Sequence, residues 1–422
     1  MSRAFEEIHA HVQTLSIIDT HEHLPHKEEA REKNTDVLRE YLAHYFSRDL
    51  ISAGLSQSDY QAAIDAKQPL MKRWDLVEPY WEVARFTGYG RSLDLAAKAL
   101  YGVDGISRAT IVRLNDEFQT SLKGGQYRKV LKEKSNIEVS ILDSNLECDR
   151  TYFRSAYNIG PLVFPRNLND VNRIAGEAGM AVSSFDDWLE ASVKAMARAV
   201  EKGAVCFKDS LAYVRSLSYE RHTRAAAEEA FNDFFTAIHY PEGDTLGTIP
   251  GKPFQDFMMH WVLRESNARG WVRQVHTGLL EGSGNTLAGS DPLLLSNLFL
   301  EYPNVKFDIF HISYPWQQQL SALAKMFPNV YIDMCWAHII SPAACIEALC
   351  EWVDSVPLNK ISAFGGDYCF VDGVYGHQAL ARRNVSVSLA RKVDEGVFDV
   401  ETAKKIAGLL FHDNPKRLFA LD

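Results

Sequence analysis

Ser16–Leu24, with the sequence SIIDTHEHL, has the apolar start of a short buried strand and ends in two histidines. Side chains alternate between the two faces of a strand, so Ile17, Asp19, His21 and His23 are predicted to share one face. Two imidazoles on one face can converge on a single cation, because zinc and related metals accept nitrogen ligands. Taken alone, the pair fits a metal site and two hydrogen-bonded histidines at a strand end about equally well.

The bulk composition restricts the class of protein. The chain has 422 residues, of which 46% are hydrophobic and 24% charged, and this fits one large soluble α/β barrel with insertions. Its formal net charge of -10 and the absence of a long basic run argue against nucleic acid or an anionic membrane as partner. No apolar stretch approaches the ~20 residues that span a bilayer, and the first ten residues lack the apolar core of a signal peptide. We therefore expect a cytoplasmic protein.

From residue 136 onward, apolar segments alternate with amphipathic helices, which is typical of a parallel sheet. Together with the first strand they make eight. The seven later strands are predicted at residues 137–142, 158–164, 204–208, 271–277, 305–311, 330–334 and 361–367. Eight parallel strands close a barrel, so the sequence predicts a single (β/α)8 TIM-barrel domain over residues 1–422.

The segment after the first strand breaks this alternation. Residues 25–130 are rich in Glu, Lys, Arg, Leu and aromatic residues with helical spacing, so they are predicted to form a helical insertion. Connections between neighbouring strands are usually far shorter. The insertion is expected either to build part of a binding pocket or to form a lid or oligomer surface without substrate contacts.

Four later strands end in side chains that can serve a metal. Polar groups at the carboxyl ends of barrel strands are where such folds keep their chemistry. Singly, each has an ordinary explanation as an ion pair, a loop cap or a core histidine. The four side chains are Lys208, His276, His311 and Asp367. Together with the two opening histidines, their order along the chain is a much more specific signal than any one of these residues alone.

This order resembles that of the amidohydrolase superfamily of metal-dependent barrel enzymes, over essentially the whole chain. The opening IIDTHEHLPHKEE at residues 17–29, followed by a helical insertion, is similar to the opening of uronate isomerases. The second half resembles the amidohydrolase-2 type domain found fused to glutamine-synthetase-like proteins. The stretches that carry this second likeness are FKDSLAY (207–213), YPNV (302–305), HISYP (311–315), FPNV (327–330) and NPKRLF (414–419).

The resemblance implies a divalent metal, zinc or manganese, held by His21 and His23 with Asp367, and a site completed by His276 and His311. Lys208 has two open roles. It can be carboxylated and bridge two metals, with His276 and His311 holding the second, or it can orient the substrate beside a single metal, which we favour.

The predicted function is hydrolysis of a C–N or C–O bond in a small carboxylated substrate. Metal-activated water would attack, Asp367 would move the proton, and His311 would hold the substrate oxygen. The main alternative is a uronate-isomerase-like aldose–ketose isomerase; a decarboxylase and a non-enzymatic binding protein follow. We expect a homo-oligomer. Further candidate pocket residues follow predicted strands, and they are Arg166, Tyr213, Arg215, Tyr314, Trp336 and His338.

Overall fold

The computed structural model describes residues 2–240, 249–282 and 284–421. Its eight strands are parallel and pair in sequence order, which confirms the predicted (β/α)8 class. The strands are β1 (Ile17–Glu22), β2 (Ile137–Leu142), β3 (Phe153–Asn158), β4 (Ala204–Asp209), β5 (Val272–Val275), β6 (Lys306–Ile309), β7 (Val330–Asp333) and β8 (Ile361–Ser362). Backbone hydrogen bonds join β1 to the chain after β8, from Thr20 N to Phe364 O and from Asp367 N to His21 O. They make the barrel nearly closed.

Two predicted strands differ from the structure. The third strand covers Phe153–Asn158, and the prediction of residues 158–164 was wrong because Gly160–Val163 is a helical turn, α8. Pro161 lies in the first turn of α8 and has no N–H to donate to a strand ladder. The eighth strand is only two residues long. After it, Ala363 N donates to Leu410 O, so the chain leaves the ladder before it reaches Asp367.

The first strand also departs from simple alternation. Ile18 packs inside the barrel floor with Val139 and Cys206, whereas Ile17 belongs to the larger cluster between barrel and helices. The register of β1 against β2 shifts between Ile17 and Ile18 and again between Asp19 and Glu22. The prediction that Ile17 shares the face of the histidines is therefore wrong, because such irregularities re-aim side chains along a strand.

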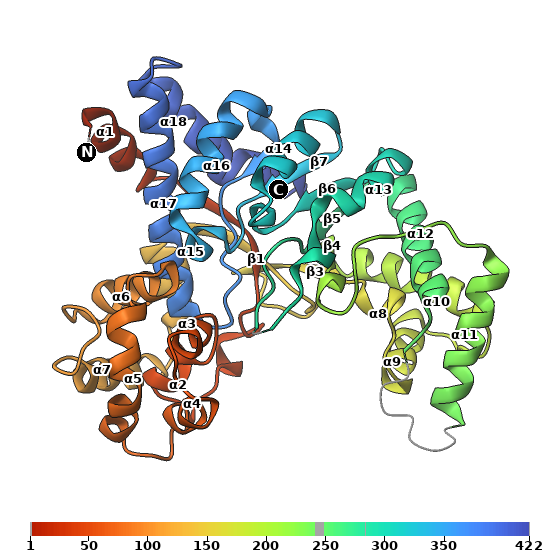
Figure 1. Ribbon diagram of the computed structural model, residues 1–422, viewed down its shortest axis with the longest axis horizontal. Coiled ribbons are helices and arrows are strands. Elements are labelled where there is room, and N and C mark those ends of the chain that lie inside the picture. The colour runs from red at the N-terminus through yellow and green to blue at the C-terminus, as the bar shows by residue number, and fades with distance from the viewer. Residues whose placement is uncertain (1, 241–248, 283, 422) are drawn as a thin grey trace.

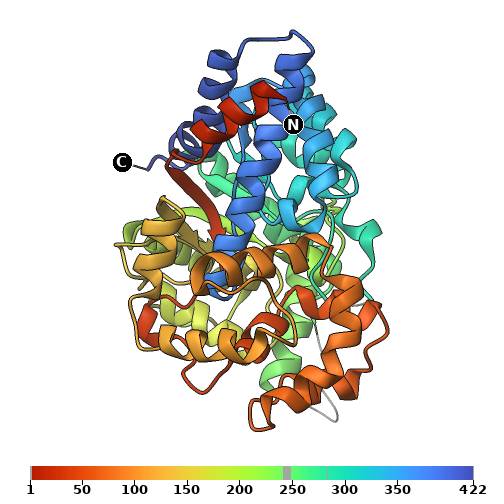
Figure 2. The same cartoon turned by 90° about the vertical axis from the view of Figure 1, so that its left-hand side faces the viewer.

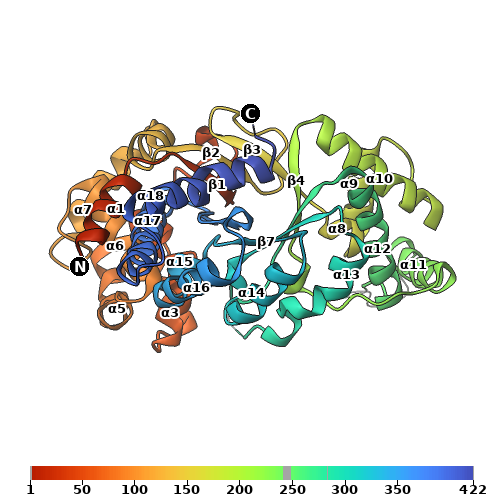
Figure 3. The same cartoon turned by 90° about the horizontal axis from the view of Figure 1, so that it is seen from above.

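Helices between β1 and β2 group on one side of the barrel, opposite the helices that follow β3 and β4 (Figures 1 and 3). The chain turns between Leu42 and Phe46, so that α2 and α3 are separate helices. The helices of this segment are α2 (Val37–Leu42), α3 (Phe46–Ser52), α4 (Gln57–Ala63), α5 (Leu70–Ala84), α6 (Gly88–Tyr101), α7 (Ile111–Ser121) and the π-helix η2 (Arg128–Lys134).

The remaining helices surround the barrel. The first of them, α1 (Arg3–Val12), precedes the barrel and packs on α17 and α18 (Figure 2). The others are α9 (Leu168–Ala178), α10 (Phe185–Glu201), α11 (Arg224–His239), α12 (Lys252–Arg269), α13 (Ser296–Glu301), α14 (Gln317–Met326), α15 (Ala337–Ile340), α16 (Pro342–Ser355), α17 (Val371–Asp394), α18 (Val400–Gly408) and α19 (Asn414–Leu418). None of the helices in the described ranges is long and apolar enough to cross a membrane.

Helices α6 and α17 approach each other closely because of a glycine. A Cβ placed on Gly376 would lie 1.9 Å from Ser92 O, a backbone atom of α6. We expect Gly376→Ala to lower the free energy of unfolding by at least about 1–3 kcal/mol, because backbone must move to relieve the overlap. Gly408→Ala is the matched control, since that glycine has helical dihedrals and a Cβ added there would meet no atom within 4 Å. Chemical denaturation that shows equal stability for both variants would contradict this packing.

Candidate metal centre

Three predicted ligands converge at the carboxyl end of β1. His23 Nε2 lies 3.3 Å from His21 Nε2 and 3.1 Å from Asp367 Oδ1, and His21 Nε2 lies 3.7 Å from the same oxygen. His21 and Asp367 are buried, whereas the His23 side chain is 42% exposed. Two ring nitrogens and a carboxylate oxygen within this distance of one another are a donor set that suits a divalent metal.

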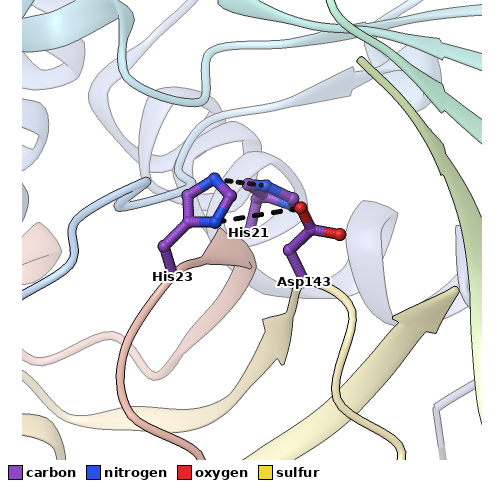
Figure 4. A group of neighbouring side chains, drawn as sticks. All are labelled: His21, His23 and Asp143. Atoms are coloured by element: carbon purple, nitrogen blue, oxygen red, sulfur yellow. Dashed lines mark hydrogen bonds and ion pairs between the residues drawn. The ribbon is translucent and has the colours of Figure 1, made fainter. Parts of the chain in front are cut away.

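Asp143 joins this group, although it was not among the predicted site residues. Its Oδ2 lies 3.8 Å from His23 Nδ1, and Figure 4 shows it at the end of β2 beside both histidines. The sequence contains a signal for it, since Asp143 directly follows a predicted barrel strand. That signal was weaker than a His-x-His pair because aspartate commonly caps loops.

His276 and His311 pair on the other side of Asp367. Each donates one ring N–H to a backbone carbonyl, His276 Nε2 to Leu279 O at 2.9 Å and His311 Nδ1 to Cys335 O at 2.9 Å. A carbonyl can only accept, so the other two nitrogens are bare lone pairs in the neutral rings. These two nitrogens, His276 Nδ1 and His311 Nε2, face each other at 3.0 Å. Facing lone pairs are unfavourable unless a cation or a donor from a bound molecule lies beside them.

Burial keeps these two rings neutral. Burial and the neighbouring His311 and Lys208 hold the pKa of His276 well below its usual range. Burial also lowers the pKa of His311 to about 4, against an opposing effect of Asp367. Neutral imidazoles at neutral pH are the form that binds metal.

Asp367 stays ionised. Burial alone would raise the pKa of its carboxyl, but the hydrogen bond and charge of His23, with His21 and His311, hold it well below the usual range. Its two oxygens face different partners, with Oδ1 toward His23 and Oδ2 3.9 Å from His311 Nε2. One carboxylate can therefore contact a cation and a substrate at once.

Several residues of the loops around the site adopt a strained backbone conformation. Residues other than glycine adopt positive φ after β6, at His311, Ile312 and Ser313, and again at Trp336 after β7 and Asp367 after β8. Such conformations cost about 1–3 kcal/mol each and cluster at functional sites. Here they turn successive side chains toward the barrel mouth.

The glycines before Asp367 bring its loop against β1. A Cβ on Gly365 would lie 2.5 Å from Thr20 Oγ1, and one on Gly366 would lie 1.7 Å from Glu22 Oε1. The absence of side chains on these two glycines allows β1 and the loop to touch, which places Asp367 beside His21.

Lys208, from β4, is buried beside the same group, with its Nζ 4.1 Å from the centre of the Phe310 ring. Within the described ranges no carboxylate or other group forms an ion pair or hydrogen bond with this Nζ. Its charge contributes, after burial, to lowering the pKa of His21. The side chain is thus available to an added group.

The insertion contributes aromatic side chains to the site. Tyr45, at the start of α3, donates a hydrogen bond from its hydroxyl to Asp367 O at 2.6 Å, and its ring stacks on Trp336 with centroids 4.6 Å apart. Trp336 in turn lies edge-on to His311 at 5.1 Å. From the β4 side, the Tyr213 ring lies 4.6 Å from that of His276. These contacts favour a pocket role for the insertion over a remote lid.

Of the other predicted pocket residues, two form ion pairs away from the proposed ligands, one hydrogen-bonds behind the β8 loop, and one packs against the main hydrophobic cluster. Arg166 and Arg215 pair with Asp170 and Asp256 on the helical side of the chain. His338 is fully buried and donates a hydrogen bond from Nε2 to Ala363 O at 2.8 Å, behind the β8 loop. Tyr314 is half-buried in the loop after β6, packed against the main hydrophobic cluster.

Comparisons with known proteins identify a family and several relatives of this chain. The family model described as "Amidohydrolase" matches residues 171–421. The chain is 26% identical over 229 residues to "Protein fluG" of Emericella nidulans, covering 53% of this chain and 26% of that protein. It is 23% identical over 281 residues to "Uronate isomerase" of Thermotoga maritima, covering 59% of this chain and 57% of the relative. It therefore spans about a quarter and just over half of these relatives' lengths.

A solved structure matches over nearly the full length. The crystal structure of uronate isomerase from Thermotoga maritima superposes with a TM-score of 0.81, covering 99% of this chain and 98% of that one. The sequence identity of this match is 17%, so the likeness establishes the shared fold and no more.

Proposed function

Since this chain belongs to the amidohydrolase family, we propose that it is a divalent-metal-dependent isomerase that interconverts an aldose and a ketose bearing a carboxylate, as in a uronate. The observation that carries this choice is the sequence similarity to uronate isomerases over 281 residues. It supports the isomerase alternative more than the hydrolase that the sequence analysis put first. The barrel family hosts many reactions, so the assignment depends on the site and its relatives rather than on the fold.

His21, His23 and Asp367 would hold one metal ion, zinc or manganese, with His276 beside it. The facing lone pairs of His276 and His311 support a cation or hydrogen donor at this position. When bound, the ion would polarise a carbonyl oxygen of the substrate as a Lewis acid. The partly exposed His23 leaves one side of the donor set open to the barrel mouth.

Asp367 is the proposed base. In the aldose-to-ketose direction, a proton leaves C2 for the Asp367 carboxylate and returns to C1. The C2 hydroxyl proton passes to the C1 carbonyl oxygen, so atoms and charge balance without any water being consumed. The lowered pKa of Asp367 keeps the carboxylate deprotonated at neutral pH, which is the form that a base must have. The hydrogen bond from Tyr45 to Asp367 O fixes its backbone, and His311 Nε2 can accept a substrate hydroxyl.

Lys208 is proposed to hold a substrate oxygen, with one metal per chain. A hydrogen bond to a charged group contributes about 1.5–3 kcal/mol, so Lys208→Met should raise KM for a hexuronate by about 10- to 100-fold. Bound metal should remain unchanged, because no hydrogen bond or ion pair joins Lys208 to a carboxylate or to a proposed metal ligand in the described residues. Elemental analysis that finds two metals in the wild type and fewer in Lys208→Met would instead support a carboxylated, bridging lysine.

A substrate panel separates the reactions. The metal-loaded protein is incubated with D-glucuronate, D-galacturonate, D-glucose, an N-acyl amino acid and a sugar lactone, and products are identified by NMR. We expect a ketose from at least one hexuronate and no conversion of glucose, which lacks the carboxylate. Cleavage of the amide or lactone without hexuronate turnover would overturn the isomerase proposal in favour of the hydrolase.

A further inference from the structure

A second cavity lies outside the barrel mouth and contains none of the proposed metal ligands. It has a volume of about 500 Å³ and is bounded by α1, the end of α5, α6 and α17. Three arginines line it, and they are Arg85, Arg91 and Arg383. This volume lies within the range of about 300–1,000 Å³ that small-molecule sites occupy.

Two of these arginines line the same cavity without an ion-pair partner among the described residues. Across the described ranges, neither the Arg91 nor the Arg383 guanidinium forms an ion pair or a hydrogen bond, and both are half-buried. Burial, and then the charge of Arg383, lower the pKa of Arg91. The adjacent Arg382 shows the usual arrangement, since it donates to the carbonyls of Val12, Leu15 and Ser135.

The nearby carboxylates are already committed. Asp94, which lines the cavity, accepts from Ile106 N and pairs with Lys98 Nζ at 3.1 Å. Glu82 pairs with Arg85, since its carboxylate lies 3.4 Å from Arg85 Nε. Burial and Arg383 lower the pKa of His9, so its ring adds no charge at neutral pH. No ion pair neutralises the Arg91 and Arg383 charges within the part of the chain that the structure describes.

We propose that this cavity binds a small phosphomonoester. Guanidinium groups match phosphate oxygens in paired hydrogen bonds, and two of them facing one space favour a doubly charged anion. A bare phosphate would leave most of about 500 Å³ unfilled, whereas Phe86 and Leu95 offer apolar wall for the body of an ester. Gln13, which also lines the cavity, adds an amide that can bond a hydroxyl. The bound ligand would contact residues of α1, α6 and α17 at the same time.

The test measures binding to the full-length protein by calorimetry and by thermal melting at constant ionic strength. The probes are inorganic phosphate, glucose 6-phosphate and adenosine 5′-monophosphate. At least one ester should raise the melting temperature and bind at least tenfold more tightly than inorganic phosphate. Arg91→Gln/Arg383→Gln should weaken that binding at least tenfold, and Arg113→Gln, an exposed arginine on α7, should leave it unchanged.

The double variant should fold, because it removes a like-charge pair, and its ligand-free melting temperature should equal or exceed that of the wild type. The proposal is overturned if no ester binds the wild type, if the double variant binds equally well, or if inorganic phosphate binds as tightly as the esters. A change of oligomer mass in the double variant, measured by light scattering, would also overturn it, since the arginines would then serve contacts between copies.

Discussion

Asp367→Asn is expected to lose about 10²- to 10⁴-fold in kcat, the range that a positioned base contributes to proton transfer. Asparagine has nearly the same size and can still offer an oxygen toward His23, but it cannot accept the substrate proton. We therefore expect bound metal to fall much less than turnover. The informative quantity is kcat per bound metal, from steady-state kinetics and elemental analysis of the same preparation.

Asp143→Asn is the matched control for this substitution. Asp143 is a second carboxylate close to His23, at 3.8 Å, and no ion pair joins it to His311 in the described residues. It should retain most of the wild-type kcat per bound metal. If Asp367→Asn were as active per metal as Asp143→Asn, the base would have to be another residue, such as His311.

His21→Ala/His23→Ala is expected to remove the metal and with it nearly all turnover, by more than about 10³-fold, because two of the three proposed ligands are lost. The wild type should contain about one equivalent of divalent metal per chain, and the double variant should contain almost none. His412→Ala, which removes a histidine paired with Glu138 near the start of β2, serves as control and should keep its metal. Equal metal in all three proteins would place the ion elsewhere.

Much of the site follows from residues at the ends of predicted strands. A parallel barrel brings all carboxyl ends to one rim, so His21, His276 and Asp367 could be grouped without any knowledge of their distances. The close contact between Gly366 and Glu22 was harder to predict from the sequence than the ligand positions, because a glycine in a loop has several explanations.

Contacts that depend on the insertion could not be predicted. The Tyr45 hydroxyl donates a hydrogen bond to the backbone carbonyl of Asp367, 322 residues later in the chain, and the local sequence of neither segment indicates this contact. The third strand was misplaced because the apolar run after Asn158 resembles a strand, while Gly160-Pro161 starts a helical turn. The reaction itself was also underdetermined, since the same donors can activate water or polarise a carbonyl.

The most direct test of the proposed isomerase follows a single labelled carbon. Metal-loaded protein is incubated with each hexuronate of the substrate panel, labelled as [1-¹³C], and the ¹³C spectrum is recorded as the reaction proceeds. The account predicts that the labelled C1 changes from a hemiacetal carbon to a hydroxymethyl carbon of the ketose. It also predicts that this conversion is far slower with the Asp367→Asn variant. A C1 signal that remains a hemiacetal with fully loaded wild-type protein for every hexuronate of the panel would contradict it.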